Sequence, residues 1–284
     1  MTGPVVRRAS AVAGGHRVSY QEAGPADGPI VVLVHGLASD GDTWDRAIGP
    51  LARRGMRVIA VDLIGHGHSD KPDSPYLLDD FAESLKGLLD VLAVENATIC
   101  GHSLGGAVAV HFSYHFPGRV QRLVLVSAGG LGREVHLLLR AAALPGAPRV
   151  LNAVMSPRLR RLYSHASVHR VLRLTPDNLA NLRRAGRTLA DDAGRAAFFA
   201  ALRGVIDPAG QRGSFLEMRY LAEYLPTMIV WTEGDGVIPV EHARAAHQAL
   251  PGSRLVLFPS GGHEPHRRHA EDFAQEVARF VGDT

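Results

Sequence analysis

Residues 98–107 read Thr98-Ile99-Cys100-Gly101-His102-Ser103-Leu104-Gly105-Gly106-Ala107, and they contain the only G-x-S-x-G match in the chain. The apolar residues up to Cys100 are typical of a buried strand, and the run 107–112 is typical of an apolar helix. Ser103 is therefore expected at a sharp turn from strand to helix, where its hydroxyl is exposed above the edge of a sheet. The flanking glycines allow the strand and the helix to approach closely. The pattern predicts a serine nucleophile.

Strand-like and helix-like runs alternate on both sides of this turn. Before residue 131 the apolar patterns predict strands at 30–34, 57–63, 97–100 and 120–127, with helices at 44–54 and 79–92. An antiparallel hairpin of residues 5–11 and 18–22 is expected at the edge of the sheet. Further on, the predicted order is strand 227–231, helix 240–250, strand 254–258 and helix 267–281. The alternation indicates an α/β fold with a mostly parallel, doubly wound sheet.

The alternation stops between residues 131 and 222. This segment has helical spacing interrupted by prolines, so we expect several short helices inserted between two strands of one sheet. The predicted domains are a core of 1–130 and 223–284 and a helical cap of 131–222. The cap holds 15 arginines against 6 acidic residues, which fits either a positive mouth for acidic substrates or solvated helix faces that pair with the acidic core. A set of apolar residues in this segment either lines an acyl or alcohol pocket or forms the core of the cap: Leu137 to Leu139, Leu144, Leu151, Val154, Met155, Leu159 and Leu162.

Composition excludes several classes of protein. The chain has 284 residues, 46% of them hydrophobic, and a net charge of +3, which suits one core domain with a modest insertion. The single cysteine, Cys100, rules out an intrachain disulfide or a cysteine metal site, and we expect it in the core. No apolar run is long enough for a signal peptide or a membrane span, and no basic patch with interleaved aromatics suggests nucleic acid. We expect a cytoplasmic protein whose oligomeric state the sequence leaves open.

These motifs together resemble the α/β-hydrolases that carry a helical cap. The matching landmarks are the serine turn, His35-Gly36, the tract from Asp62 to Ser69, the segment Trp231 to Pro239, and Gly261-Gly262-His263. The resemblance implies an eight-stranded sheet and an enzyme without a cofactor. It also implies that the tract from Asp62 to Asp70 is a structural turn. A metal site at His66 and His68 would need further ligands nearby, and the sequence offers none.

A serine nucleophile needs a base and an acid that orients the base, and in α/β-hydrolases the chain order is serine, acid, histidine. Asp235 lies in the loop after strand 227–231 and is preferred to its rival Glu233, which is closer to the strand. His263 follows the last strand, and His266 and His269 are the nearby alternatives. His102 is expected to point away from the site, because side chains alternate along a strand. The candidate catalytic residues are therefore Ser103, Asp235 and His263.

The oxyanion hole requires two N–H donors. One is the N–H of Leu104, the first residue of the helix after Ser103. By the resemblance the second is the N–H of Leu37, and His35 braces this loop without doing chemistry. The loop has one glycine after its histidine and lacks a Gly-Gly-Gly run, which argues against bulky tertiary-alcohol esters. No substrate-binding residue is assigned.

The serine restricts the reaction. Relatives that form an alkyl-enzyme, the haloalkane dehalogenases and epoxide hydrolases, have aspartate at this position. We predict a hydrolase that cleaves small or medium carboxylic esters through an acyl-enzyme. The alternatives are a carbon–carbon bond hydrolase of the meta-cleavage type, whose loop is usually similar to Gly-Pro-Gly-Ala where this chain has 37–41, and a lactonase or perhydrolase. A non-catalytic ligand-binding protein would not need all five groups of the predicted site.

Overall fold

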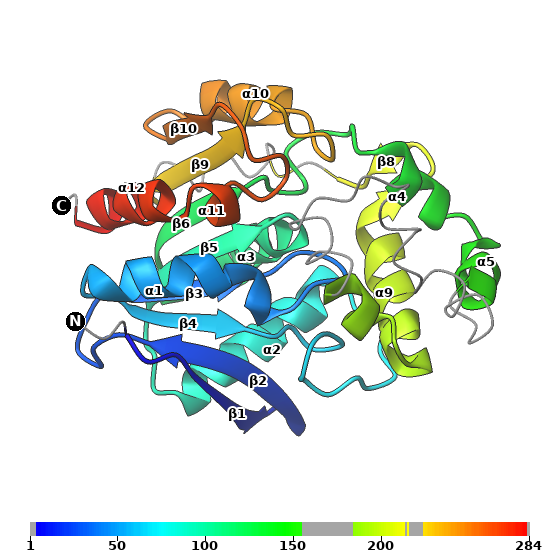
Figure 1. Cartoon of the computed structure of the whole chain (residues 1–284), viewed down its shortest axis with the longest axis horizontal. Helices are drawn as coiled ribbons and strands as arrows, with labels where there is room; N and C mark the ends of the chain where they lie inside the picture. The colour runs from blue at the N-terminus through cyan, green and yellow to red at the C-terminus, as the bar shows by residue number, and fades with distance from the viewer. Residues whose placement is uncertain (1–3, 155–183, 214, 216–223, 283–284) are drawn as a thin grey trace, which may run out of the picture.

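The computed structural model describes residues 4–154, 184–213, 215 and 224–282, and the statements below concern these residues. They form one eight-stranded sheet in the order β1-β2-β4-β3-β5-β6-β9-β10 (Figure 1). The strands are β1 (Arg7–Ala13), β2 (His16–Ala23), β3 (Ile30–Val34), β4 (Arg57–Val61), β5 (Ala97–His102), β6 (Val120–Val126), β9 (Thr227–Thr232) and β10 (Arg254–Phe258). The pairs β1·β2 and β2·β4 are antiparallel and all others are parallel. The predicted α/β fold is confirmed.

Helices cover both faces of the sheet and form two separate apolar cores. One core holds apolar residues of α2 (Leu78–Val91), α3 (Leu104–His115) and α10 (Glu241–Ala249). The other holds residues of α1 (Asp45–Arg53) and α12 (Ala270–Gly282). The remaining helical pieces outside the segment 131–222 are short: η1 (Gly41–Trp44), η2 (Pro117–Arg119) and α11 (Pro265–Arg268).

The central strands are apolar throughout because both of their faces are covered. Val31 to Val34 in β3 have no solvent exposure, and β5 is buried at every residue. Strands β3, β5, β9 and β10 run parallel, so the loops at their carboxyl ends lie along one edge of the sheet. These loops carry the residues predicted to be functional.

The segment 131–222, which we call the insert, lies between the neighbouring strands β6 and β9. Its described helices include α4 (Leu137–Ala142), α5 (Ala147–Val154) and α9 (Asp192–Val205), and residues 184–188 are helical as well. The expectation of helices alone was wrong, since β7 (Ile206–Asp207) and β8 (Gly210–Gln211) form an antiparallel hairpin. Its turn depends on Asp207, whose carboxylate accepts from the N–H groups of Ala209 and Gly210. Two-residue strands are too short to give an alternating pattern in the sequence.

Several element boundaries differ from the sequence expectation. The predicted helix 44–54 begins as the 3₁₀ turn η1, and the predicted strand 57–63 ends at Val61. The last helix is split into α11 and α12 at His269. Across the described ranges, no helix combines the length and apolar character needed to cross a membrane.

Candidate active site

Ser103 joins β5 to α3 in a left-handed backbone conformation, with φ 53° and ψ −118°. For a residue with a side chain this conformation costs about 1–3 kcal/mol and persists only where the surroundings enforce it. Packing enforces it here: a Cβ on Gly101 would lie 2.1 Å from the carbonyl oxygen of Gly105. A Cβ on Gly105 would lie 2.3 Å from the carbonyl oxygen of Val34. The elbow therefore has the tight strand-to-helix geometry that its glycines predict.

Asp235 and His263 form a part-buried pair across the loops that follow β9 and β10. Nδ1 of His263 lies 2.9 Å from Oδ2 of Asp235, whose side chain has no solvent exposure. The carboxylate also accepts hydrogen bonds from the N–H groups of Val237 and Ile238, at 2.8 and 3.1 Å. Burial raises the pKa of Asp235, but the hydrogen bond with His263 and these two N–H groups outweigh it and leave the pKa below its ordinary value. The aspartate is therefore charged and fixed in position.

The main chain of His263 is held from two sides. Nε2 of His102 donates to its carbonyl oxygen at 2.8 Å, and the hydroxyl of Thr232 donates to the carbonyl oxygen of Gly262 at 2.6 Å. With Nδ1 paired to Asp235, Nε2 is the atom that can accept a proton. Nε2 is buried and has no hydrogen-bond partner in the described part of the chain. The imidazole thus has the tautomer and the vacant acceptor that a general base requires.

The rival residues have other contacts. Glu233 is half exposed and pairs with Arg244 at 2.7 Å. His266 is fully buried, lies 4.2 Å from the ring of Trp44, and has its pKa held well below the ordinary value by burial. His269 stacks on Phe258 at 4.7 Å. Within the described residues, none of these three groups forms a hydrogen bond or ion pair with Asp235, so the geometry favours His263 as the base.

His102 is a packed neighbour of the elbow. Its ring lies 4.8 Å from that of His263 and 4.7 Å from that of His266, and burial lowers its pKa to about 3. It is therefore neutral, with Nε2 carrying the proton that bonds the carbonyl oxygen of His263. The expectation that His102 points away from the site is therefore wrong, because its ring packs against that of His263 and bonds the carbonyl oxygen of this candidate base.

The loop after β3 packs directly against the elbow. A Cβ on Gly36 would lie 3.0 Å from that of Ser103, so only glycine permits this approach without displacement. Leu37 and Leu104, the two predicted oxyanion donors, line the same pocket as Ser103. Both residues predicted to donate an N–H to the oxyanion therefore line the pocket into which Ser103 opens.

His35 fixes the orientation of the peptide between Gly36 and Leu37. Its Nδ1 donates to the carbonyl oxygen of Gly36 at 2.8 Å, and its Nε2 accepts from the N–H of Leu63 at 2.9 Å. Burial lowers the pKa of His35, which keeps the ring neutral as these two bonds require. A trans peptide is planar, so holding the Gly36 carbonyl also sets the direction of the Leu37 N–H on its opposite side. His35 is thus a positioning residue.

We expect His35→Gln to lower kcat for ester hydrolysis roughly tenfold to 100-fold, because the Leu37 N–H loses its fixed direction. The N–H of Leu63 would also lose its buried acceptor, which costs about 1–3 kcal/mol of unfolding free energy. Steady-state kinetics and urea denaturation measure the two effects. His66→Gln is the matched control, since His66 is equally buried next to His35 but its ring, among the described residues, hydrogen-bonds the carbonyl oxygen of Ile64 alone. Equal kcat losses in both variants would contradict the positioning role.

Ser103 opens into an apolar cavity of about 50 Å³. Core residues line one side, and the insert contributes Val135, Leu139, Val205, Ile206, Gln211, Arg212 and Phe215. Of the insert leucines singled out in the sequence, Leu139 lines this cavity, whereas Leu137 and Leu138 are about 70% exposed. Met155, Leu159 and Leu162 lie outside the described residues.

Gln211 and Arg212 reach the pocket without any sequence signal that marks them. The Gln211 side chain accepts from the N–H of Gly130 at 2.7 Å and donates to the carbonyl oxygen of Glu134 at 3.1 Å. It therefore ties the end of the insert to its beginning. Among the described residues, the guanidinium of Arg212 has one ion pair, 4.0 Å from Asp207, and Arg212 is the cationic residue of the pocket lining.

The tract from Asp62 to Asp70 is a structural turn, as the resemblance implies. Asp62 is buried, and its carboxylate accepts from the N–H groups of Gly41 and His68 at 2.7 and 2.9 Å. The hydroxyl of Ser69 donates to the carbonyl oxygen of Asp62 at 2.6 Å. The acidic side chain thus organises two loops, and the tract contributes no titratable group to the pocket.

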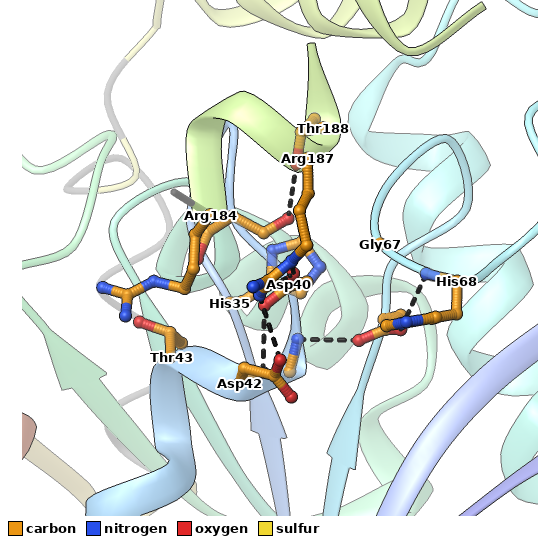
Figure 2. Close-up of polar contacts among 12 residues, drawn as sticks. His35, Asp40, Asp42, Thr43, Gly67, His68, Arg184, Arg187 and Thr188 are labelled. Atoms are coloured by element: carbon orange, nitrogen blue, oxygen red, sulfur yellow. Dashed lines mark hydrogen bonds and ion pairs between the residues drawn. The ribbon is translucent and has the colours of Figure 1, made fainter. Parts of the chain in front are cut away.

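Two arginines of the insert form ion pairs with the core. Figure 2 shows the pair that Arg187 forms with Asp40 and Asp42. Arg187 lies 2.7 Å from Asp40, whose side chain is fully buried, and 3.0 Å from Asp42. Arg184 lies 2.8 Å from Glu264, the residue that follows His263. We call these ion pairs the insert–core contacts. They link the position of the insert to the loop that carries the candidate base.

We expect Arg187→Gln to lower the unfolding free energy by about 1–3 kcal/mol, because it leaves the buried carboxylate of Asp40 without its cation. The loss stays in this range because the Arg187 side chain is 47% exposed and water screens the ion pair. Asp40→Asn removes the charge of the partner, and the variant with both substitutions completes a double-mutant cycle. Urea denaturation should give a coupling energy above about 1 kcal/mol, whereas losses that simply add would contradict a direct interaction.

Comparison with known proteins places this geometry in a family. A family model for the alpha/beta hydrolase fold matches residues 29–270. An uncharacterized protein of Mycobacterium tuberculosis is 39% identical over 274 residues, which cover 95% of this chain and 80% of that protein. A 2-hydroxy-6-oxo-6-(2'-aminophenyl)hexa-2,4-dienoic acid hydrolase of Metapseudomonas resinovorans is 30% identical over 280 residues, covering 95% and 89%. Among solved structures, a serine hydrolase involved in carbazole degradation has a TM-score of 0.76 and 26% identity, covering 98% and 99%.

The family match extends over most of the chain and includes the elbow and the loops after β3, β9 and β10. It agrees with the eight-stranded, mostly parallel sheet. The chain belongs to the α/β-hydrolase fold family.

Proposed function

We propose that this protein is a serine hydrolase that cleaves carboxylic esters of small to medium size through an acyl-enzyme on Ser103. The observation that carries the proposal is the pair of His263 with the buried carboxylate of Asp235, in which the free Nε2 of His263 is suited to accept the serine proton. The elbow backbone of Ser103 and its place in an apolar pocket support the same reaction.

In the proposed reaction Oγ of Ser103 attacks the ester carbonyl while its proton passes to Nε2 of His263. The charged carboxylate of Asp235 holds the Nδ1–H and stabilises the imidazolium that forms. The N–H groups of Leu37 and Leu104 bind the oxyanion. Collapse of the intermediate breaks the carbon–oxygen bond, and the leaving alcohol takes the proton from His263. A water, deprotonated by the same histidine, then releases the acid and restores Ser103.

The lining and size of the pocket favour a substrate with a short, uncharged acyl group. Most of its lining residues are apolar, and its size of about 50 Å³ suits a few carbon atoms better than a long chain. We also propose that residues 131–222 act as a cap, because Leu139, Ile206 and Gln211 of the insert line the pocket together with Ser103.

A carbon–carbon bond hydrolase of the meta-cleavage type is the second candidate. Its support is Arg212, a cation in a mostly apolar pocket lining, whose guanidinium would pair with a carboxylate on the substrate. The relatives include enzymes named for such substrates, among them a 2-hydroxymuconate semialdehyde hydrolase of Pseudomonas putida that is 29% identical over 280 residues. The two candidates use the same nucleophile and differ in what the pocket binds.

We expect Arg212→Gln to raise KM roughly tenfold for a substrate with a carboxylate on its acyl side, such as a dicarboxylic monoester, and to leave neutral esters within about twofold. Losing a charge-assisted hydrogen bond affects only the charged substrate. Arg149→Gln is the control, since Arg149 lies in α5 outside the pocket. Equal changes for charged and neutral esters would remove the argument for carboxylate recognition.

The function is tested with p-nitrophenyl esters from acetate to laurate, a simple lactone, and a vinylogous 1,5-diketone acid. We expect the highest kcat/KM on esters of two to four carbons, because the pocket is small. Faster turnover of the diketone acid would favour the carbon–carbon hydrolase. Tight product binding without turnover of any substrate would favour a ligand-binding protein and overturn the proposal.

A further inference from the structure

Three possible metal ligands meet on the surface where α2 and α3 pack together, outside the pocket. Asp79 lies in the first turn of α2, and His111 and His115 lie one turn apart near the end of α3. Oδ1 of Asp79 is 2.7 Å from Nε2 of His111 and 3.2 Å from Nε2 of His115. The ligand atoms all lie within 4.8 Å of one another. The candidate active site uses none of these residues.

The geometry suits one ion held by three ligands. Residues four apart on a helix project from the same face, and the two imidazole rings lie 4.5 Å apart. Two ligands bound at about 2.1 Å in a tetrahedral site are roughly 3.4 Å apart, so small side-chain rotations are sufficient. Two imidazoles with one carboxylate are the ligands that zinc, nickel and copper ions accept, whereas calcium and magnesium prefer oxygen.

Access and charge also suit a cation. Asp79 is 62% exposed and His115 is 40% exposed, so an ion can enter and keep water ligands. The hydrogen bond from His111 lowers the pKa of Asp79, so the carboxylate is charged. The histidines lie at the C-terminal end of α3, where the helix dipole favours positive charge. Lys86, the nearby cation on α2, is already paired with Asp90 at 2.7 Å.

We propose that Asp79, His111 and His115 bind one divalent transition-metal ion of the zinc and nickel class. The ion would join the first turn of α2 to the last turns of α3. Leu78 precedes Asp79, and Ala107 lies one turn before His111, and both line the pocket of Ser103. Metal binding would therefore hold two walls of that pocket together, whatever reaction the pocket performs.

The test uses full-length protein without a histidine tag, purified free of metal. Titration with Zn²⁺ and with Ni²⁺ is followed by calorimetry and by the unfolding midpoint. We expect one ion bound per chain and a rise in Tm of about 5 °C at a hundredfold excess over Kd, with no response to Mg²⁺. His111→Gln, His115→Gln and Asp79→Asn should each weaken binding roughly tenfold to 100-fold.

Two control variants make the result decisive. His16→Gln removes an exposed histidine of the edge hairpin and should leave binding unchanged. His263→Gln tests whether the ion binds the candidate active site. Binding that survives in the His111→Gln/His115→Gln double variant but disappears in His263→Gln would overturn the proposal. Binding of no ion by the wild-type chain would overturn it as well. Asp79 and His115 are exposed, so their variants are expected to fold.

Discussion

Replacing Ser103 with alanine is expected to lower kcat for ester hydrolysis by about 10⁴- to 10⁶-fold, because the acyl-enzyme can no longer form. Alanine takes the same space in the left-handed turn, so the elbow and the oxyanion donors should persist. Substrate binding should then be little changed. Single-turnover kinetics with p-nitrophenyl butyrate and circular dichroism of the variant measure both effects.

Ser127→Ala is the matched control for this experiment. Ser127 is another buried serine with a left-handed backbone, φ 43°, and its hydroxyl has no hydrogen-bond partner among the described residues. It follows β6 and does not line the pocket. We expect its activity within about twofold of wild type. A Ser103→Ala variant with more than about one-tenth of the wild-type kcat would show that another group is the nucleophile.

Asp235→Asn is expected to lower kcat by about 10⁴-fold. The amide of asparagine would donate to Nδ1 of His263 and force the proton onto Nε2, where the ring can no longer accept the serine proton. The carboxylate is anchored by the N–H groups of Val237 and Ile238, so an isosteric replacement should leave the loop in place. The kcat of the purified variant, together with its unfolding midpoint, measures catalysis separately from stability.

Glu233→Gln separates the two acids of this loop. Glu233 pairs with Arg244 on the surface, and both side chains are 48% exposed, so its loss should change kcat by less than about twofold. If Glu233→Gln were the more damaging substitution, the assignment of Asp235 would be wrong.

The alternation of strands and helices could be predicted because each element carries its own local pattern. The predicted strand 30–34 agrees with β3 at both ends, since a strand buried on two faces is apolar throughout. The turn at Ser103 could be predicted equally well, because glycines at fixed offsets from a serine leave few other backbone arrangements. The Asp235–His263 pair required the chain order of the resembling family in addition to the residues themselves. Their catalytic roles stay predictions.

The features that the sequence does not predict depend on contacts between segments far apart in the chain. Arg187 meets Asp40 across 147 residues, and nothing local to either residue indicates the pair. The β7–β8 hairpin is too short to show a periodicity, so Gln211 and Arg212 could not be placed at the pocket. Asp79 and His111 lie on different helices, 32 residues apart, and only the packing of α2 on α3 brings them together.

The most direct test of the central claim is the labelling of the wild-type chain with a fluorophosphonate, followed by intact mass and peptide mapping. The account predicts one adduct per chain, located on Ser103, with ester turnover lost in proportion to labelling. Labelling should be much slower in His263→Ala, because the base that activates the serine is gone. An adduct on a different residue, or unlabelled Ser103 in a chain that still hydrolyses esters, would contradict the account.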